Sequence, residues 1–217
     1  YMNKFAIDSI RALGFDNDCV IHDSPRMIFQ ELKVISSYGR QSAFDLCIPE
    51  IRKTILGNTN LPIISASPFS VLYIKRHEKS LRKILNEDEL LQSLASQYKV
   101  KVIDPSELSF LQQVNEFSSA KCVISMHGAA LTNIIWMREG SHVIELYKNL
   151  QSYIGNIYEP PNSPSPFYPR LSAVMKLNYY LFQCVSPESQ IAFSHSGLIV
   201  DCISLKKLMK KIFKKST

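Results

Sequence analysis

The sequence lacks several features that would place it in a special class of protein. No apolar run approaches the ~20 residues that cross a bilayer, and the first residues show no signal-peptide pattern. The five cysteines are scattered, with no CxxC pair for zinc or redox chemistry, so we interpret them as buried or half-buried free thiols in a reducing compartment. Asn162-Ser163-Pro164 does not fit the glycosylation pattern. These absences favour a cytoplasmic protein. Because the chain opens on Tyr1, it looks like a fragment, and a lost leader or anchor stays an open alternative.

The positive charge of the chain is concentrated at its C-terminal end. The net charge is +6, which equals the contribution of the lysines at positions 206, 207, 210, 211, 214 and 215. At 100° per residue these lysines fall on one half of a helix over residues 205–215, opposite an apolar half. The pattern predicts a surface helix docked by its apolar stripe, with a membrane-surface or polyanion contact as the alternative. The rest of the chain is close to neutral, which argues against a nucleic-acid binder.

The N-terminal part contains few strand signals. We expect helices over residues 5–13 and 44–56, a short strand at 19–22 and another apolar run at 32–36. Residues 58–68 are rich in turn formers and form the candidate linker. The sequence therefore predicts two parts, residues 1–62 and 63–217.

Beyond the linker, short β-rich runs alternate with helical segments, which predicts an α/β fold with a Rossmann-like parallel sheet and flanking helices. The expected strands are 71–74, 100–103, 122–126 and 143–146, and the expected helices are 87–98, 106–117 and 129–137. Ser109 competes with Ser106 as the N-cap of the second of these helices. Five prolines between residues 160 and 169 predict a loop. Residues 172–185 are ambiguous between helix and strand, and the apolar run 198–203 leads into the lysine helix.

The turn after the predicted strand 122–126 has the composition of an anion site. His127 and Gly128 make the turn, and Ala129 and Ala130 begin a helix. Small residues let a ligand approach the backbone, while free N–H groups and the helix dipole favour an anion such as phosphate. Side-chain hydrogen bonds to the ligand could come from Thr132 and Asn133. A tight structural turn is the alternative, and His127 is either a turn histidine or a substrate contact.

A second polar cluster follows the strand 71–74. Ligands of open parallel sheets bind outside the carboxyl ends of the strands, where Arg76 could bind a diphosphate bidentately. The same cluster holds Lys75, His77, Lys79, Arg82, Asn86 and Glu87. Glu145, at a strand end on the same rim, could accept hydrogen bonds from sugar or ribose hydroxyls. The alternative for the cluster around Arg76 is a solvated basic turn, and the alternative for Glu145 is a structural ion-pair partner.

Taken in order, these segments resemble glycosyltransferase family 61. The similar stretches are 71–76, 82–87, 109–114, 127–133, 139–140 and 143–146. The ordered series is more specific than any one motif. Asp201 with Leu205 and Leu208 resembles the closing strand and helix of the family, and the first 60 residues faintly resemble the end of its N-terminal domain. Two positions depart from the family pattern: Ala130 stands where a second glycine is usual, and Glu139 where proline is usual.

The resemblance implies the donor-binding half of a GT-B fold, with residues 1–62 as an incomplete remnant of the N-terminal, acceptor-side domain. It also implies that Arg76 and the turn over residues 128–133 bind the diphosphate and that Arg82 and Asn86 support the rim of this site. Residues 104–108 would border the nucleotide base.

The implied activity is an inverting, metal-independent transfer from a nucleotide-sugar, expected to be UDP-linked, to a glycan or protein hydroxyl. No cofactor and no metal are expected. His127 is the candidate catalytic base, with His22 and Asp23 as alternatives. Family members include eukaryotic protein O-GlcNAc transferases and bacterial relatives linked to capsule or lipopolysaccharide synthesis, so the secretory lumen is an alternative location. A non-catalytic module that binds a nucleotide or an anionic glycan is the alternative function.

Overall fold

The computed structural model describes residues 4–14, 40–58, 69–78, 80, 82–148, 167–187 and 197–214. The chain divides into two compact units, residues 1–62 and 63–217. In the first unit, the helices α1 (Lys4–Ala12) and α2 (Arg40–Asn58) confirm the two expected helices, although α2 begins earlier than its pattern suggested. Gly14 follows α1 with a left-handed φ of 93°. The apolar runs 19–22 and 32–36 lie outside the described residues, and the role of this unit as an acceptor-side remnant stays a prediction.

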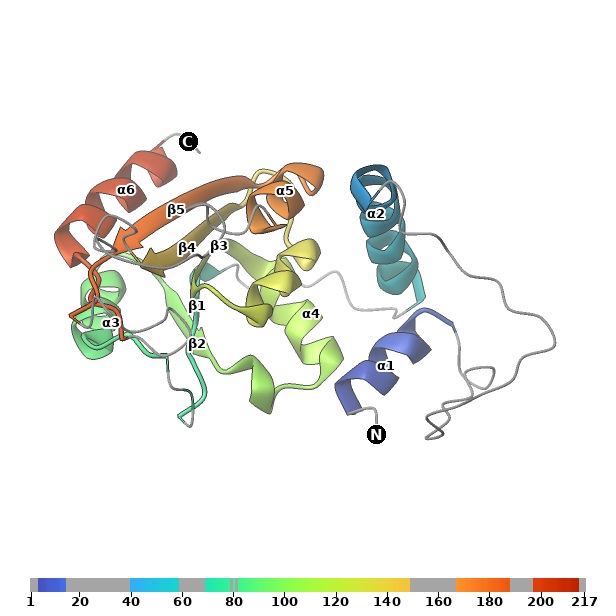
Figure 1. Ribbon diagram of the computed structural model, residues 1–217, viewed down its shortest axis with the longest axis horizontal. Helices are drawn as coiled ribbons and strands as arrows, with labels where there is room; N and C mark the ends of the chain where they lie inside the picture. Colours follow the sequence, from blue (N-terminus) through green and yellow to red (C-terminus); the bar gives the residue numbers. More distant parts are fainter. Residues whose placement is uncertain are drawn as a thin grey trace, which may run out of the picture. The chain divides into compact units, whose positions relative to one another are not determined.

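The second unit is built on one sheet of five parallel strands, which confirms the expected α/β class (Figure 1). The strand order is β2-β1-β3-β4-β5. The strands are β1 (Phe69–Ile74), β2 (Val100–Ile103), β3 (Ala120–Met126), β4 (His142–Lys148) and β5 (Asn178–Cys184). The central strands read as continuous apolar runs because helices cover both faces of a parallel sheet. One strand more is present than the alternation predicted, since β5 lies in the ambiguous stretch.

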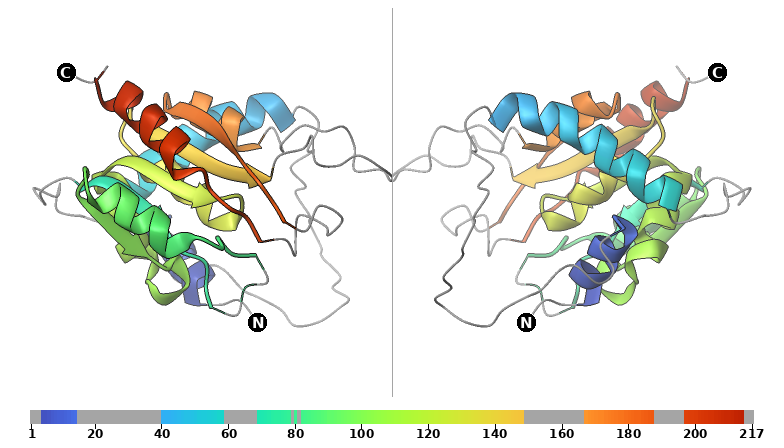
Figure 2. Two further views of the ribbon diagram at one scale, coloured as in Figure 1. Left: turned by 90° about the vertical axis from the view of Figure 1, so that its left-hand side faces the viewer. Right: turned by 90° about the vertical axis from the view of Figure 1, so that its right-hand side faces the viewer.

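Helices cover the two faces of the sheet in separate groups (Figures 1 and 2). One face carries α3 (Glu87–Ala95) and α6 (Cys202–Lys214), which contact each other. The opposite face carries α4 (Phe110–Ser119), the 3₁₀ helix η2 (Ala129–Trp136) and α5 (Phe167–Val174). A short 3₁₀ turn, η1 (Pro105–Glu107), connects β2 to α4. Among the described helices, none is long and apolar enough to span a membrane.

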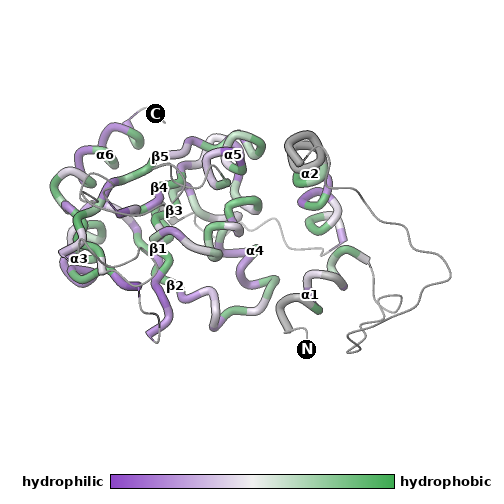
Figure 3. The backbone as a smooth tube through the Cα atoms, viewed as in Figure 1, coloured by the Kyte–Doolittle hydropathy of each residue, from purple (hydrophilic) through white to green (hydrophobic). Residues whose placement is uncertain are grey.

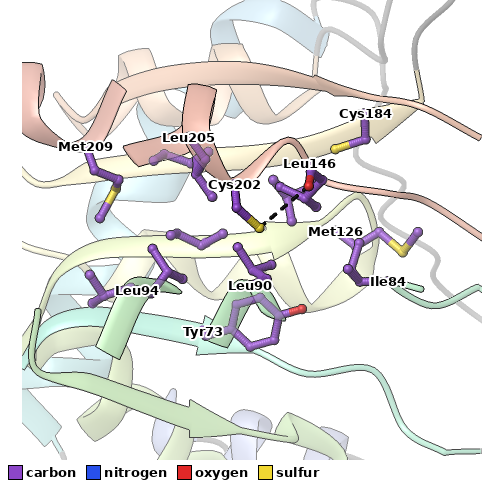
Figure 4. Packing of buried hydrophobic residues seen from close by; sticks show 14 of the residues in the cluster. Tyr73, Ile84, Leu90, Leu94, Met126, Leu146, Cys184, Cys202, Leu205 and Met209 are labelled. Atoms are coloured by element: carbon purple, nitrogen blue, oxygen red, sulfur yellow. Dashed lines mark hydrogen bonds between the residues drawn. The ribbon is translucent and has the colours of Figure 1, made fainter. Parts of the chain in front are cut away.

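The main hydrophobic core lies between the sheet and the pair α3/α6 (Figure 4). Leu90 of α3 and Leu205 and Met209 of α6 are buried against strand residues such as Tyr73 and Leu146. The Tyr73 hydroxyl donates to Glu87 over 2.7 Å, and burial, followed by the charge of Glu87, raises the pKa of Tyr73. This core fixes the strands whose carboxyl ends carry the polar residues described below.

Helix α6 docks by its apolar stripe, as its pattern predicted. Leu205, Met209 and Ile212 are buried, and Lys207 and Lys211 are among its exposed lysines. Hydrophilic and hydrophobic residues therefore alternate along the α6 tube in Figure 3. The helix begins at a good N-cap: the Asp201 carboxylate accepts hydrogen bonds from the backbone N–H groups of residues 203 and 204. Bonds from Ser204 lower the pKa of Asp201. Residue 215 lies outside the described part of the chain.

Three expected helices differ from the structure, and the one expected over 87–98 already ends at Ala95. The helix expected over 106–117 begins only at Phe110, because Ser109 and Gln112 form a reciprocal capping box. Ser106 instead lies in η1, where Asp104 accepts its backbone N–H at 2.9 Å. The helix expected over 129–137 is a 3₁₀ helix. The ambiguous stretch 172–185 is divided between the end of α5 and β5, with Lys176 in a left-handed conformation (φ 54°) at the turn between them.

The cysteines in the described residues are free thiols. Cys122, Cys184 and Cys202 are buried, as expected, whereas Cys47 is exposed. Burial raises the pKa of each buried thiol, that of Cys184 to about 12. The three buried cysteines therefore act as core residues with little thiolate character.

Candidate functional site

The candidate site lies at the carboxyl ends of β1 and β3. In a sheet of this strand order the chain leaves β1 toward β2 and then returns past β1 to β3, so the order of strands reverses between β1 and β3. Open parallel sheets bind ligands at such a switch point. Arg76 comes two residues after β1, and His127 comes directly after β3. The topology thus brings together the two segments that the sequence singled out.

Two arginines converge on one backbone carbonyl at this point. The Nη2 of Arg76 donates to the carbonyl oxygen of His127, and the Nη1 of Arg82 donates to the same oxygen at 3.1 Å. Burial, followed by the charge of Arg82, lowers the pKa of Arg76. Within the described residues, Arg76 forms no ion pair with a carboxylate. A half-buried pair of guanidinium groups with this arrangement favours an additional anion.

Gly128 is needed here for space. Its φ of 160° is an extended conformation that any residue adopts. A Cβ at this position, however, would lie 2.1 Å from Nη2 and 2.8 Å from Cζ of Arg76. The guanidinium group therefore lies directly against the backbone of the turn, close to the first residues of η2. The first N–H groups of a helix have no partner within it, so cationic and N–H donors gather at the same place.

The ring of His127 is held by a buried carboxylate. Nδ1 of His127 pairs with Oε1 of Glu145, and the hydroxyl of Tyr179 donates to Oε2 of the same carboxylate. The Glu145 residue is only 1% exposed. Burial, then the hydrogen bond to Glu145 and its charge, raise the pKa of Tyr179. Both carboxylate oxygens thus have partners within the protein, and Glu145 does not present the acceptor for sugar hydroxyls that its position at the strand end suggested.

Two further tyrosines enclose the His127 ring. The rings of Tyr147 and Tyr168 meet it edge to face, with centroid distances of 5.2 and 5.5 Å. The Tyr168 hydroxyl donates to the carbonyl oxygen of Gly128 over 2.7 Å and also interacts with Thr132. Burial is the largest cause of a raised pKa at Tyr168. Helix α5 therefore packs against the turn and fixes both its backbone and its histidine.

The two asparagines proposed to contact a donor have structural partners. Asn133 is buried and donates to Gln113 at 2.8 Å, while its Oδ1 accepts from the Trp136 indole at 3.1 Å, which ties η2 to α4. Asn86 pairs with both backbone groups of Val200, at 2.9 and 3.0 Å. These bonds hold the site together, which suits the expected role of Asn86 as a support of the rim. A direct contact of Asn133 with a donor stays a prediction.

The remaining expected positions lie at the rim. Ala129 and Thr132 are exposed and Ala130 is half-buried, all in η2. Residues 104–108 follow β2 on the same edge of the sheet. The alternative bases His22 and Asp23 lie outside the described residues.

Sequence reasoning missed Tyr168 and Tyr179. A period-two reading of residues 178–184 as a strand would have placed Tyr179 on the face of Glu145.

The expectation of a metal-free site stays a prediction. Among the described residues, no group of three or more His, Cys, Asp and Glu side chains is placed to hold a metal ion. The sequence does contain the pair Asp16 and Asp18, one residue apart, and closely spaced carboxylates are suitable ligands for a divalent cation. Both residues lie outside the described part of the chain.

Comparisons with known proteins match most of the chain to one family. The family described as Glycosyltransferase 61 matches residues 10–144. The mouse EGF domain-specific O-linked N-acetylglucosamine transferase is 41% identical over 70 residues, which cover 30% of this chain and 13% of that protein. The protein O-linked-mannose beta-1,4-N-acetylglucosaminyltransferase 2 of Xenopus tropicalis is 35% identical over 126 residues, 56% of this chain and 20% of that protein. The Xenopus laevis protein of the same name is 31% identical over 152 residues, 67% of this chain and 24% of that protein.

The matched regions span between 13% and 24% of the length of these three curated relatives. All three are vertebrate transferases that are named for O-linked glycans, and they do not support the expected link to capsule or lipopolysaccharide synthesis.

Proposed function

This chain belongs to glycosyltransferase family 61, and on that premise we propose that its second unit binds a nucleotide-sugar donor at the carboxyl ends of β1 and β3. The bound donor would serve the transfer of its sugar to a hydroxyl group of a protein or a protein-linked glycan. The observation that carries the proposal is the pair Arg76 and Arg82, which share the His127 carbonyl at the switch point of the sheet.

The diphosphate of the donor is the group that this arrangement suits. A diphosphate offers several anionic oxygens to two guanidinium groups and to the first N–H groups of η2. Gly128 keeps the backbone and the Arg76 guanidinium within reach of the same ligand. The exposed Thr132 and the small residues Ala129 and Ala130 line the approach to this turn.

The proposed reaction is a single displacement with inversion. The acceptor hydroxyl oxygen bonds to the anomeric carbon, the bond from that carbon to the diphosphate oxygen breaks, and the hydroxyl proton passes to a general base. Arg76 and Arg82 stabilise the negative charge that develops on the leaving nucleoside diphosphate. We assign the base to His127, and we propose that no metal takes part.

The relatives suggest the chemical class of the substrates. Their names specify the transfer of N-acetylglucosamine, to EGF domains in one case and to O-linked mannose in the other. We therefore propose a UDP-linked N-acetylglucosamine donor, with an O-linked position on a protein as the acceptor. A non-catalytic module that only binds the nucleotide is the alternative.

A thermal-shift screen tests donor binding. UDP, GDP, CMP and their sugar conjugates are added to the chain in the presence of EDTA, because a ligand that binds only the native state raises Tm by mass action. We expect one nucleotide to raise Tm, Arg76→Ala to abolish the rise, and the exposed Arg138→Ala to leave it intact. A rise that survives in Arg76→Ala would refute the assignment. Binding without transfer to an O-mannosylated or EGF-domain acceptor would support the alternative module.

The exposed lysines of α6 support a second, independent proposal, a contact with an anionic membrane surface. Because the apolar stripe of α6 is buried in the core, such a contact would be electrostatic, without insertion of side chains. Binding to vesicles that contain phosphatidylserine should fall with salt and with Lys207→Gln/Lys211→Gln; binding that persists at high salt would refute it. A cytoplasmic location stays our proposal, with the secretory lumen as the alternative, and imaging of the tagged protein in cells would decide between them.

A further inference from the structure

We propose that Glu145 is a positioning residue that fixes the tautomer of His127, and that Tyr179 orients the Glu145 carboxylate for this task. The proposal deepens the proposed function, because it rests on His127 as the group that receives the proton of the acceptor. In this proposal Glu145 does not bind the sugar, as its sequence position had suggested, but acts on the reaction by holding the His127 ring.

The faces of the sheet show why these three side chains meet. Ile144 and Leu146 point into the core beneath α3 and α6, so Glu145 between them points to the opposite face. Tyr180 packs against the same core, so Tyr179 lies on the face of Glu145. His127, directly after β3, reaches that face from the neighbouring strand. The tyrosine and the histidine then bind the two oxygens of one carboxylate.

The donors and acceptors decide which nitrogen carries the proton. The raised pKa of Tyr179 keeps its hydroxyl protonated, so the hydroxyl donates and Oε2 of Glu145 accepts. An ionised carboxylate has only acceptors, and Oε1 therefore requires a donor, which is the N–H at Nδ1 of His127. The neutral imidazole then has its proton on Nδ1, and Nε2 is the basic nitrogen.

The surroundings of His127 keep the ring in this orientation. Tyr147 on β4 and Tyr168 on α5 contact it edge to face. Arg76 and Arg82 bind the backbone carbonyl of the same residue. Glu145 and Tyr179 complete the described contacts on the other side of the ring, through the carboxylate that pairs with Nδ1. These contacts fix the orientation of the ring before any substrate binds.

Long-range ¹⁵N–¹H NMR of the histidine rings tests the tautomer directly. The chain contains five histidines, and the His127 signals are assigned by their loss in His127→Gln. In the wild-type chain, at a pH where the ring is neutral, we expect the proton on Nδ1 and the shift of an unprotonated nitrogen at Nε2. The opposite assignment in the wild-type chain would overturn the proposal without any need for a variant.

Glu145→Gln gives the second test. Tyr179 should hold the new amide oxygen, which leaves the amide N–H₂ facing Nδ1, so the proton should move to Nε2. Glu139→Gln, a change of the same kind at an exposed carboxylate, should leave the His127 signals unchanged. Tyr179→Phe should keep the proton on Nδ1, because Oε1 of Glu145 still pairs with that nitrogen. An unchanged tautomer in Glu145→Gln would overturn the proposal.

Nucleotide binding separates this inference from the proposed function. Because Arg76 donates to the backbone carbonyl of His127 and not to Glu145, Glu145→Gln should keep the nucleotide-dependent rise in Tm while transfer falls by roughly 10²–10⁴-fold, the range of general acid–base catalysis. Loss of both binding and transfer would indicate a merely structural Glu145 and would refute the positioning role. The expected tautomers in a chain that binds no nucleotide would support the positioning of His127 and refute the donor site.

Discussion

Replacement of Gly128 by alanine would place a methyl group where the Arg76 guanidinium lies. The new Cβ would be 2.1 Å from Nη2 and 3.0 Å from Nη1, so the guanidinium must move away from the turn. Losing a hydrogen bond to a charged group costs about 1.5–3 kcal/mol, which corresponds to roughly a 10- to 150-fold rise in the Kd for the nucleotide. The fold should survive, because the obstacle is the end of a long side chain and the backbone of residue 128 is extended.

Isothermal titration with UDP and a urea unfolding curve would be recorded for Gly128→Ala. We expect weaker nucleotide binding and a free energy of unfolding lowered by about 0.5–2.6 kcal/mol. The lost hydrogen bond from Arg76 to the His127 carbonyl costs about 1.5–3 kcal/mol, while a glycine-to-alanine change stabilises by about 0.4–1 kcal/mol through the unfolded chain. Gly57→Ala is the matched control, because a Cβ there has nothing within 4 Å. Undiminished UDP affinity in Gly128→Ala would show that the position of Arg76 against the turn does not matter for binding.

Three further predictions concern stability. Asn133→Ala should lower the free energy of unfolding in urea by about 2–4 kcal/mol, because it leaves the buried amide oxygen of Gln113 and the indole N–H of Trp136 without their partner; a loss below ~1 kcal/mol would contradict this. Burial lowers the pKa of His142, so as the pH falls the His142 ring is protonated in the unfolded chain before it is protonated in the folded chain. The free energy of unfolding therefore decreases as the pH drops through about 6.5. The stability of His142→Phe relative to wild type should therefore rise between about pH 8 and pH 5, and a constant difference would refute the reasoning. Ser109→Ala should cost about 1 kcal/mol as a lost N-cap, measured by Tm against Ser106→Ala, and equal effects of the two changes would argue against the capping box.

Much of the second unit could be predicted from local patterns. The strands β1, β2, β3 and β4 are short apolar runs followed by polar residues or small turn residues, and such runs are informative without any knowledge of their partners. The two competing N-caps were visible at Ser106 and Ser109, but only the side chain of Gln112, three residues after Ser109, completes a capping box. The start of the helix therefore depends on the reciprocal hydrogen bonds between Ser109 and Gln112, which the sequence pattern allows but does not establish.

The site was predictable where residues directly follow strands, and less so where partners come from distant segments. Arg76 and His127 stand at strand ends, so the parallel sheet alone brings them to one edge. The partners of Asn86 and Glu145 could not be read in this way. Val200 lies 114 residues from Asn86 along the chain, and Tyr179 belongs to the stretch that was ambiguous between helix and strand. An amide or a carboxylate at a strand end looks available for a ligand until its tertiary partner is known.

The assembly of the site from four strands has a consequence for the order of events in folding. The chain between Arg76 and Tyr179 passes through β2, β3 and β4, and each parallel pairing requires a crossover that closes a long loop. Among the described strands, β5 comes last, pairs only with β4 and brings the hydroxyl that orients Glu145. A refolding intermediate that has formed β1 to β4 would hold the arginines, the histidine and Glu145, yet Glu145 would lack the hydroxyl that orients its carboxylate. Helical and strand signals should therefore recover before transfer activity does, and the time between the two measures the docking of a single edge strand.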